Sequence, residues 1–213
     1  MLGFTAPATA QLAAAIVEDV QGKPAGVEFM DYVTPGKVIK LGPKDTIVLG
    51  YLKSCWRETI TGGTVTVGAE QSTVQSGTMD RAKVPCDSSY GQITEQQQGA
   101  VGATVFRSMK PNEPPQPVPG RHLTIYGTSP VVDMKGGGTL VIERIDTPGE
   151  RHSIIVNRHS LVKGKFYDVS RVRWVLTPGG SYVARLDGRE QFFNVHAQAQ
   201  PQKAIVGRLL QFD

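Results

Sequence analysis

Short β-branched runs separated by glycine form the clearest pattern of apolar and polar positions in the first half of the chain. Residues 38–41 (VIKL) precede a Gly-Pro pair that predicts a turn, and residues 47–49 (IVL) precede Gly50. In the stretch TVTV, Val65 and Val67 share one face of an extended strand while the threonines occupy the other. The pattern predicts a β-rich region, a meander or coiled stack, with one buried and one wet face.

The second half predicts a hairpin over residues 181–195. Asp187-Gly188 is the two-residue pair preferred in type I′ turns, and Leu186 then pairs with Arg189. Moving outward from the turn, the register gives one pair of opposite charges and two apolar pairs, which stabilise facing strands. The facing pairs are Arg185 with Glu190, Val183 with Phe192, and Tyr182 with Phe193.

Further strands are expected in residues 136–146, 151–162 and 172–176, where Trp174 is placed as a core residue. Residues 92–107 predict the one helix, a short one that begins after Thr94 and is followed by a strand. Plentiful glycine and proline, 24 and 14 residues, favour short strands and turns over long helices. The expected fold class is therefore mainly β.

The proline-rich stretch 109–120 (MKPNEPPQPVPG) divides the chain. Proline neither pairs steadily in a sheet nor propagates a helix, so this stretch predicts an extended, semi-rigid linker. We expect two small β domains around it, at residues 11–108 and 121–213. The alternative for the PPQP sequence within it is a ligand of the PxxP kind.

Residues 1–10 are interpreted as the remnant of a signal peptide. Ala8-Thr9-Ala10 fits the small-x-small cleavage pattern, although no basic residue precedes Lys23. An ordinary frayed terminus is the alternative. No apolar run reaches the roughly 18 residues that span a bilayer, so we expect no membrane span.

Cys55 and Cys86 are expected to form a disulfide. Thirty residues separate them, which excludes a CxxC metal or redox motif, and each lies beside a turn signal. In an oxidising compartment the closed loop would stabilise the fold by about 3 to 4 kcal/mol on the chain-entropy model. Two buried free thiols are the alternative.

Charge is unevenly distributed about the predicted linker. Residues 1–120 carry a net charge of −1 and residues 121–213 a net charge of +5, which gives the total of +4. No run of five basic residues occurs, so the excess predicts a mixed solvated surface and not a nucleic-acid partner.

The sequence carries no recognisable catalytic or metal-binding motif. The four histidines (His122, His152, His159 and His196) lack metal-ligand spacing, and the serines lack a GxSxG elbow. The acidic pairs Asp31 with Glu28 and Asp133 with Glu143 could in principle perform acid–base work, but their partners are not evident. We therefore expect no catalytic residues, no cofactor and no metal.

Two family resemblances bear on the fold. Residues 26–90, with Val38, Leu41, Ile47, Leu49, Glu58, Ile60 and GGTVTVG, resemble the repeating β pattern of FecR-type periplasmic domains. That resemblance implies a non-catalytic β module that passes a signal to a partner; regulators of that type usually have a membrane span and a cytoplasmic helical segment, and neither is evident here.

Leu176, Pro178, Gly179 and Tyr182 match the Leu-x-Pro-Gly-x-x-Tyr turn of fibronectin-type and other immunoglobulin-like sandwiches. The resemblance implies a tyrosine corner, in which the tyrosine hydroxyl bonds to the backbone upstream. An immunoglobulin-like β-sandwich is therefore expected for residues 121–213.

The whole chain also resembles exported alphaproteobacterial proteins of uncharacterised activity, on KDTIVLGYLKSCWRETITGGTVTVGAEQS and IVGRLLQF. This implies a periplasmic or secreted location, with Trp56, Arg171 and Arg173 as candidate partner-contact residues. The expected function is a non-catalytic binding or scaffold protein that contacts an envelope protein or polysaccharide. The alternative is a hydrolase acting on polysaccharide or peptide, with its site between the two domains. The sequence does not set the oligomeric state.

Overall fold

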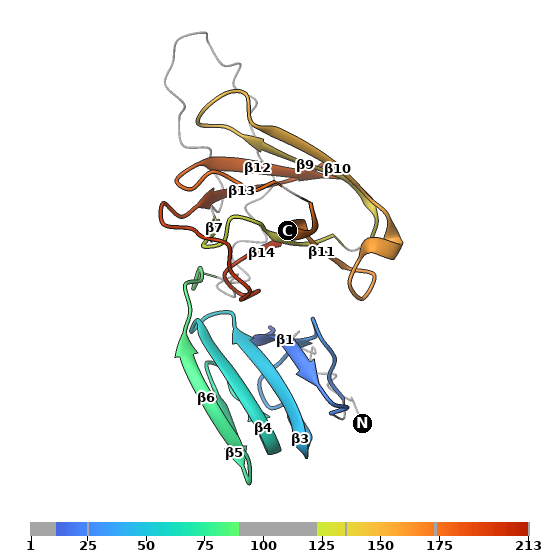
Figure 1. The fold of residues 1–213 in the computed structure, drawn as a ribbon, viewed down its shortest axis with the longest axis vertical. Helices are drawn as coiled ribbons and strands as arrows, with labels where there is room; N and C mark the ends of the chain where they lie inside the picture. Colours follow the sequence, from blue (N-terminus) through green and yellow to red (C-terminus); the bar gives the residue numbers. More distant parts are fainter. Residues whose placement is uncertain (1–11, 25, 90–122, 135, 173, 213) are drawn as a thin grey trace, which may run out of the picture.

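The computed structural model describes residues 12–24, 26–89, 123–134, 136–172 and 174–212. Within these ranges the protein is mainly β and contains no α-helix; two short 3-10 turns, η1 (Arg158–Ser160) and η2 (Val169–Arg171), complete the elements. The strands form three sheets, called A, B and C below. Figure 1 shows sheet A at one end of the molecule and sheets B and C at the other.

Sheet A contains the first six strands in the order β2-β1-β3-β4-β5, with β6 also pairing with β4. All of its pairs are antiparallel. Its strands are β1 (Ala15–Gln21), β2 (Tyr32–Val33), β3 (Val38–Tyr51), β4 (Trp56–Val67), β5 (Ser72–Gln75) and β6 (Thr78–Lys83).

The turn predicted at Gly42-Pro43 is wrong, because β3 runs through this pair from Val38 to Tyr51. The pair instead produces a register shift between Leu41 and Thr46. Opposite it, Gly62 and Gly63 of β4 have positive φ angles of 67° and 80°, which bend the neighbouring strand. The long strands therefore curl. The alternation predicted for β4 is confirmed, since Val65 and Val67 are buried in the apolar cluster of sheet A.

Sheets B and C contain the remaining strands. Sheet B has the order β10-β9-β12-β13-β7, and sheet C the order β11-β8-β14. The strands are β7 (Leu123–Ile125), β8 (Val131–Asp133), β9 (Gly138–Arg144), β10 (Arg151–Val156), β11 (Phe166–Asp168), β12 (Ser181–Leu186), β13 (Arg189–Val195) and β14 (Leu209–Gln211).

The predicted hairpin and its register are confirmed. Leu186 pairs with Arg189, and the two strands continue in that register to Ser181 and Asn194. Asp187 and Gly188 both have positive φ, 49° and 78°, as a type I′ turn requires. Local turn chemistry thus determines this part of sheet B.

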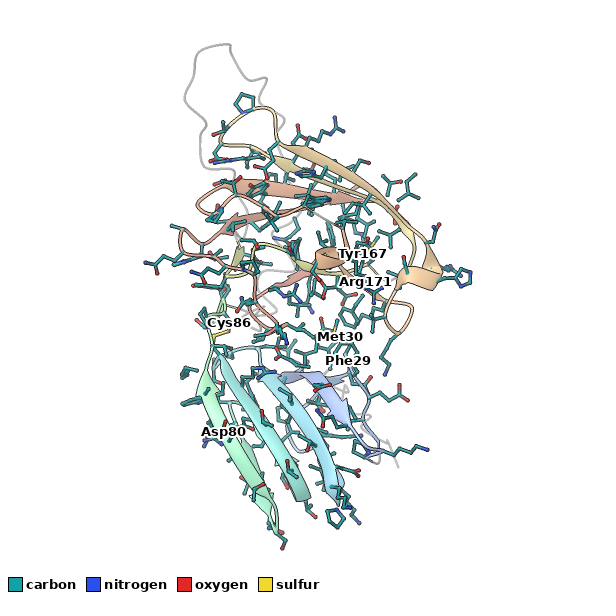
Figure 2. All side chains as sticks on the ribbon, viewed as in Figure 1. Phe29, Met30, Asp80, Cys86, Tyr167 and Arg171 are labelled. Atoms are coloured by element: carbon teal, nitrogen blue, oxygen red, sulfur yellow. A yellow bond between two sulfur atoms is a disulfide. The ribbon has the colours of Figure 1, made fainter. Side chains whose placement is uncertain are left out.

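The larger apolar core joins sheets B and C and extends to sheet A. Ile16, Met30 and Leu52 of the first half belong to the same buried cluster as Phe193 and Leu210. Figure 2 shows Met30 and Cys86 at the end of sheet A that faces the other two sheets. The side chain of Glu18, only 1% exposed, binds Arg57 at 2.8 Å and accepts a hydrogen bond from the Val206 backbone N–H at 2.7 Å. The two halves are therefore held together by apolar and polar contacts.

Several predictions concern residues outside the described ranges. These are the signal remnant at 1–10, the helix in 92–107, the linker at 109–120, and residues His122 and Arg173. The domain boundaries at 11–108 and 121–213 stay predictions. The described residues contain no helix with the length and apolarity that crossing a bilayer requires.

Candidate functional site

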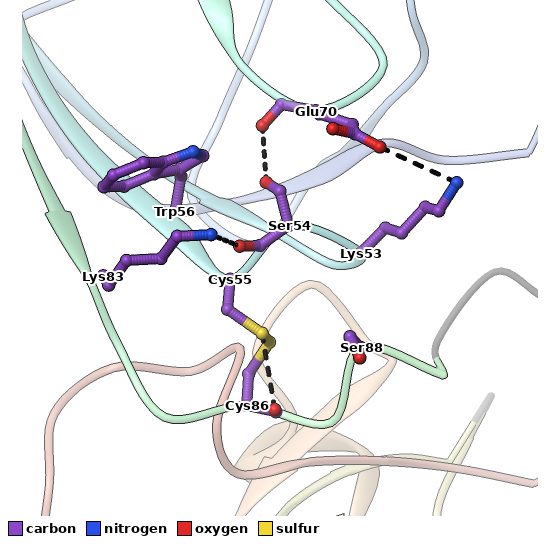
Figure 3. A pocket seen from close by; sticks show the side chains of 8 residues that line it. All are labelled: Lys53, Ser54, Cys55, Trp56, Glu70, Lys83, Cys86 and Ser88. Atoms are coloured by element: carbon purple, nitrogen blue, oxygen red, sulfur yellow. Dashed lines mark hydrogen bonds and ion pairs between the residues drawn. A yellow bond between two sulfur atoms is a disulfide. The ribbon is translucent and has the colours of Figure 1, made fainter.

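The predicted disulfide between Cys55 and Cys86 is confirmed, with a Cα–Cα distance of 5.6 Å. It ties the start of β4 to the segment that follows β6 and borders a shallow groove of about 480 Å³. Figure 3 shows the groove with Trp56, Lys53, Lys83 and Glu70 around the disulfide.

Trp56 is already engaged by cations of its own sheet. The Lys83 ammonium lies 4.3 Å from the centre of the Trp56 ring and donates to the carbonyl of Ser54. The Arg81 guanidinium lies 5.5 Å from the same ring. Cation–π contacts of this kind stabilise the end of sheet A, and the proposed role of Trp56 in partner contact stays a prediction.

The residues of the predicted tyrosine corner lie together at the start of β12. Leu176 and Tyr182 are fully buried, and Gly179 has a φ of 81°. The Thr177 backbone N–H donates to the Tyr182 hydroxyl at 2.8 Å, and that hydroxyl donates to the Glu150 carboxylate at 2.9 Å. Burial, and then the bond to Glu150, raise the pKa of Tyr182 to about 12.

The candidate contact residues of the second half are separated from Trp56. Arg171 lies in η2, where its guanidinium donates to the carbonyl of Ser160 at 2.6 Å, so it links the two 3-10 turns. Trp174 is half-buried against the large core and stacks on His152 with ring centres 4.0 Å apart. Trp56 and Arg171 therefore belong to different surfaces.

Every carboxylate of the two acidic pairs considered for acid–base work forms an ion pair with a lysine or an arginine. Asp31 and Glu28 both bind Lys163, at 2.5 and 2.8 Å. Asp133 binds Lys165, whereas Glu143 binds Arg185, so the second pair is not brought together. Over the described ranges, no group of three or more His, Cys, Asp or Glu side chains is arranged to hold a metal ion.

The candidate functional site is the outer edge of β10, which forms one border of sheet B. β10 pairs with β9 without a register shift, from Arg151 with Glu143 to Val156 with Gly138. Immediately before this ladder, the Arg144 N–H donates to the Glu150 carbonyl at 2.9 Å. Residue pairs in an antiparallel ladder alternate between bonded and non-bonded. The N–H and C=O groups of Arg151, Ser153 and Ile155 therefore point away from β9.

These outward backbone groups have no partner in the part of the chain that the structure describes. No hydrogen bond to another strand, turn or side chain is made by the outward groups of Arg151, Ser153 or Ile155. The side chain of Ile155 is 78% exposed, the highest fraction among the exposed large apolar residues described. An unpaired strand edge with an exposed apolar side chain is a template for adding another strand.

The edge of sheet A is, by contrast, covered by side chains. In the β4–β5 ladder, Gly68 and Gln71 form a hydrogen-bonded pair, so the next pair, Val67 and Ser72, is a non-bonded one. The backbone N–H and C=O of Ser72 therefore point away from β4. The Glu58 carboxylate accepts from the Ser72 N–H at 3.1 Å, and the Arg81 guanidinium donates to the Ser72 carbonyl at 3.3 Å. β6 itself carries three charged residues among its six.

The other described edge strands are short. β2 has two residues, and β7, β11 and β14 have three each. Short strands and charged side chains are the usual ways in which edges avoid pairing with other chains. β10 has six residues, no proline or bulge, and Arg151 as its single Lys, Arg, Asp or Glu residue. It is therefore the least protected edge that the structure describes.

Sequence reasoning predicted a strand over residues 151–162 but not its position at a border of the sheet. RHSIIV has two adjacent isoleucines, but this pattern does not distinguish a border strand from an inner one. Edge position depends on pairing between distant segments, which one strand's sequence does not contain.

No protein-family model matches the chain, and no curated protein or solved structure matches it either.

Proposed function

We propose that this protein is a non-catalytic, exported binding or scaffold protein that takes up an extended segment of a partner protein along the edge of β10. The observation that carries the proposal is the set of unpaired backbone groups on Arg151, Ser153 and Ile155. Adding a strand to an exposed edge gives affinity through main-chain hydrogen bonds and specificity through alternate side chains.

The side chains around the edge favour a polypeptide partner. Ile155 offers apolar surface on one face of sheet B, and on the other face Ile154 packs against the large core beside the His152–Trp174 stack. An added strand would extend both faces, so its alternate residues would contact these two apolar surfaces.

Export of the protein to an oxidising compartment is supported by the Cys55–Cys86 disulfide. Such bonds persist in the periplasm and outside the cell and are rare in the cytosol. A periplasmic or secreted location is thus part of the proposal, together with an envelope protein as the class of partner.

We infer an immunoglobulin-like sandwich for residues 121–213 from sheets B and C around a shared core and from the Tyr182 bonds to Thr177 and Glu150. Residues 11–108 would form the other unit, of the FecR type, with 109–120 as the linker.

Substitution of Ser153 tests the binding proposal. Ser153→Pro deletes an outward N–H without removing a bond to β9, and proline is tolerated on such edges. Ser153→Ala is the matched control because it keeps the N–H. Peptides are selected from a phage-displayed library of random twelve-residue sequences on the wild-type protein.

We expect the selected peptides to bind wild type and Ser153→Ala equally and Ser153→Pro at least 10-fold more weakly. Equal thermal unfolding of the two variants serves as the fold control. Selection of no peptide, or of peptides that bind Ser153→Pro as well as wild type, would contradict the proposal.

A further inference from the structure

Among the residues that the structure describes, three arginines on and beside the β10 edge have no carboxylate partner. Arg151 begins the strand, Arg158 follows its end in η1, and Arg171 of η2 binds the Ser160 carbonyl. All three are exposed, and the structure gives no ion pair for any of them within its described ranges. Their charge is therefore available to a partner.

Three carboxylates near Arg151 are already held by other side chains. Glu143 binds Arg185 at 2.5 Å, although its partner in the ladder is Arg151. Glu150 binds Tyr182 and Arg144, and Asp146 binds Arg144 at 2.8 Å. These three acids therefore leave the charge of Arg151 uncompensated.

Asp168, the acid nearest in sequence to Arg171, is also engaged. It forms a two-point contact with the Arg208 guanidinium, with both distances 3.0 Å. Paired geometry of this kind is the strongest form of arginine–carboxylate contact. Arg171 therefore does not compete for this carboxylate.

We propose that the β10 edge selects acidic extended segments, with an apolar centre beside Ile155 and Asp or Glu residues toward Arg151 at one end and Arg158 at the other. This proposal rests on the proposed function and names the class of partner segment. Six residues lie between the two arginines, which corresponds to about 23 Å along an extended chain. The acidic residues of the partner are thus six to seven positions apart. Arg171, which binds Ser160 of η1, lies near the end that faces Arg158.

Two synthetic nine-residue peptides provide the test. Both have a core of alternating valine and threonine; one carries two acidic residues at each end, and the other carries two lysines at each end. N-methylation of alternate residues leaves one edge of each peptide able to pair and prevents the peptides from pairing with themselves. Binding of a fluorescein label is followed by polarisation at low and at raised salt.

We expect the acidic peptide to bind wild type at least 10-fold more tightly than the basic one, with a difference that shrinks as salt screens the charges. The double variant Arg151→Glu, Arg158→Glu should reverse the preference. The matched control Lys40→Glu, Lys44→Glu makes the same change of net charge at two exposed lysines of sheet A and should leave the preference unaltered.

The outcomes separate the two proposals. If both peptides bind equally and both lose affinity for Ser153→Pro, strand addition stands and acidic selectivity is overturned. If neither peptide binds, the proposed function itself is overturned. If the lysine control shifts the preference as much as the arginine variant does, overall charge explains the effect and the assignment to Arg151 and Arg158 is wrong.

Discussion

Tyr182 shows how a single side chain connects three separate segments of the second half. Its ring stacks on Phe193, and its hydroxyl binds both Thr177 and Glu150. A buried hydroxyl with both of its hydrogen-bonding functions used stabilises the fold, because losing it leaves other polar groups unsatisfied.

The substitution Tyr182→Phe is expected to lower the free energy of unfolding by about 1 to 2 kcal/mol, since the Thr177 N–H and Glu150 lose their partner. Urea denaturation at neutral pH measures this change. An unchanged urea midpoint would mean that the corner hydroxyl contributes nothing.

Tyr182 also predicts a loss of stability at alkaline pH. Its pKa rises to about 12 in the folded protein, first through burial, whereas an unfolded tyrosine titrates near 10. The neutral form is therefore favoured by folding, and its contribution is complete below pH 10 and lost as the pH rises toward 12. The urea midpoint should fall between pH 9 and pH 11.5, and fall less in Tyr182→Phe. Some alkaline loss of stability should remain in Tyr182→Phe, because the pKa of buried Tyr51 also rises to about 12.

At the scale of elements, glycines at the bend of sheet A are required by close backbone contact. A Cβ at Gly63 would lie 2.3 Å from the carbonyl oxygen of Gln75, and the φ of Gly63 is 80°. Gly188 in the hairpin turn has nearly the same φ, 78°, but no atom within 4 Å of its would-be Cβ. A side chain at Gly188 would therefore introduce backbone strain alone, whereas one at Gly63 would introduce both strain and steric overlap.

We expect Gly188→Ala to destabilise the protein by about 1 kcal/mol through strain alone, and Gly63→Ala by at least about 2 kcal/mol more, because the strands must move apart. Thermal unfolding of both variants measures the difference. Equal effects would show that the bend tolerates wider strand spacing than the structure has.

Elements determined by neighbouring residues were predictable, and those determined by distant pairing were not. The Asp187-Gly188 turn, the register of its hairpin and the buried face of Val65 and Val67 follow from local chemistry. The Gly42-Pro43 turn failed because β4 pairs with β3 both before the pair, up to Leu41, and after it, from Thr46, which keeps β3 extended through a bulge. The free edge of β10 required the sheet order, which the strand's own residues do not encode.

At the scale of the whole molecule, buried polar contacts fix sheet A against the second half. The Glu18 carboxylate lies between the Arg57 guanidinium and the Val206 N–H, 188 positions away in the chain. Nothing in the sequence around Glu18 indicated that an acid following three buried apolar residues would itself be buried. Glu18 is buried because the segment that contains Val206 packs against β1.

Glu18→Ala is expected to destabilise the protein by about 3 kcal/mol, because it leaves the Arg57 charge and the Val206 N–H without their partner. Glu70→Ala is the matched control, since its pair with Lys53 is more than half exposed on both sides and should contribute below about 1 kcal/mol. Chemical denaturation compares the two variants. Similar small effects in both would mean that the contact between the halves is held by apolar packing alone.

Amide hydrogen exchange of single residues, followed by NMR with and without the acidic peptide, measures directly whether a partner strand is added at β10. We expect the Arg151, Ser153 and Ile155 amides to exchange rapidly in the free protein, since they face outward, and to slow at least 10-fold when the peptide binds. Peptide binding that leaves all three amides in rapid exchange would contradict the claim and place the partner elsewhere.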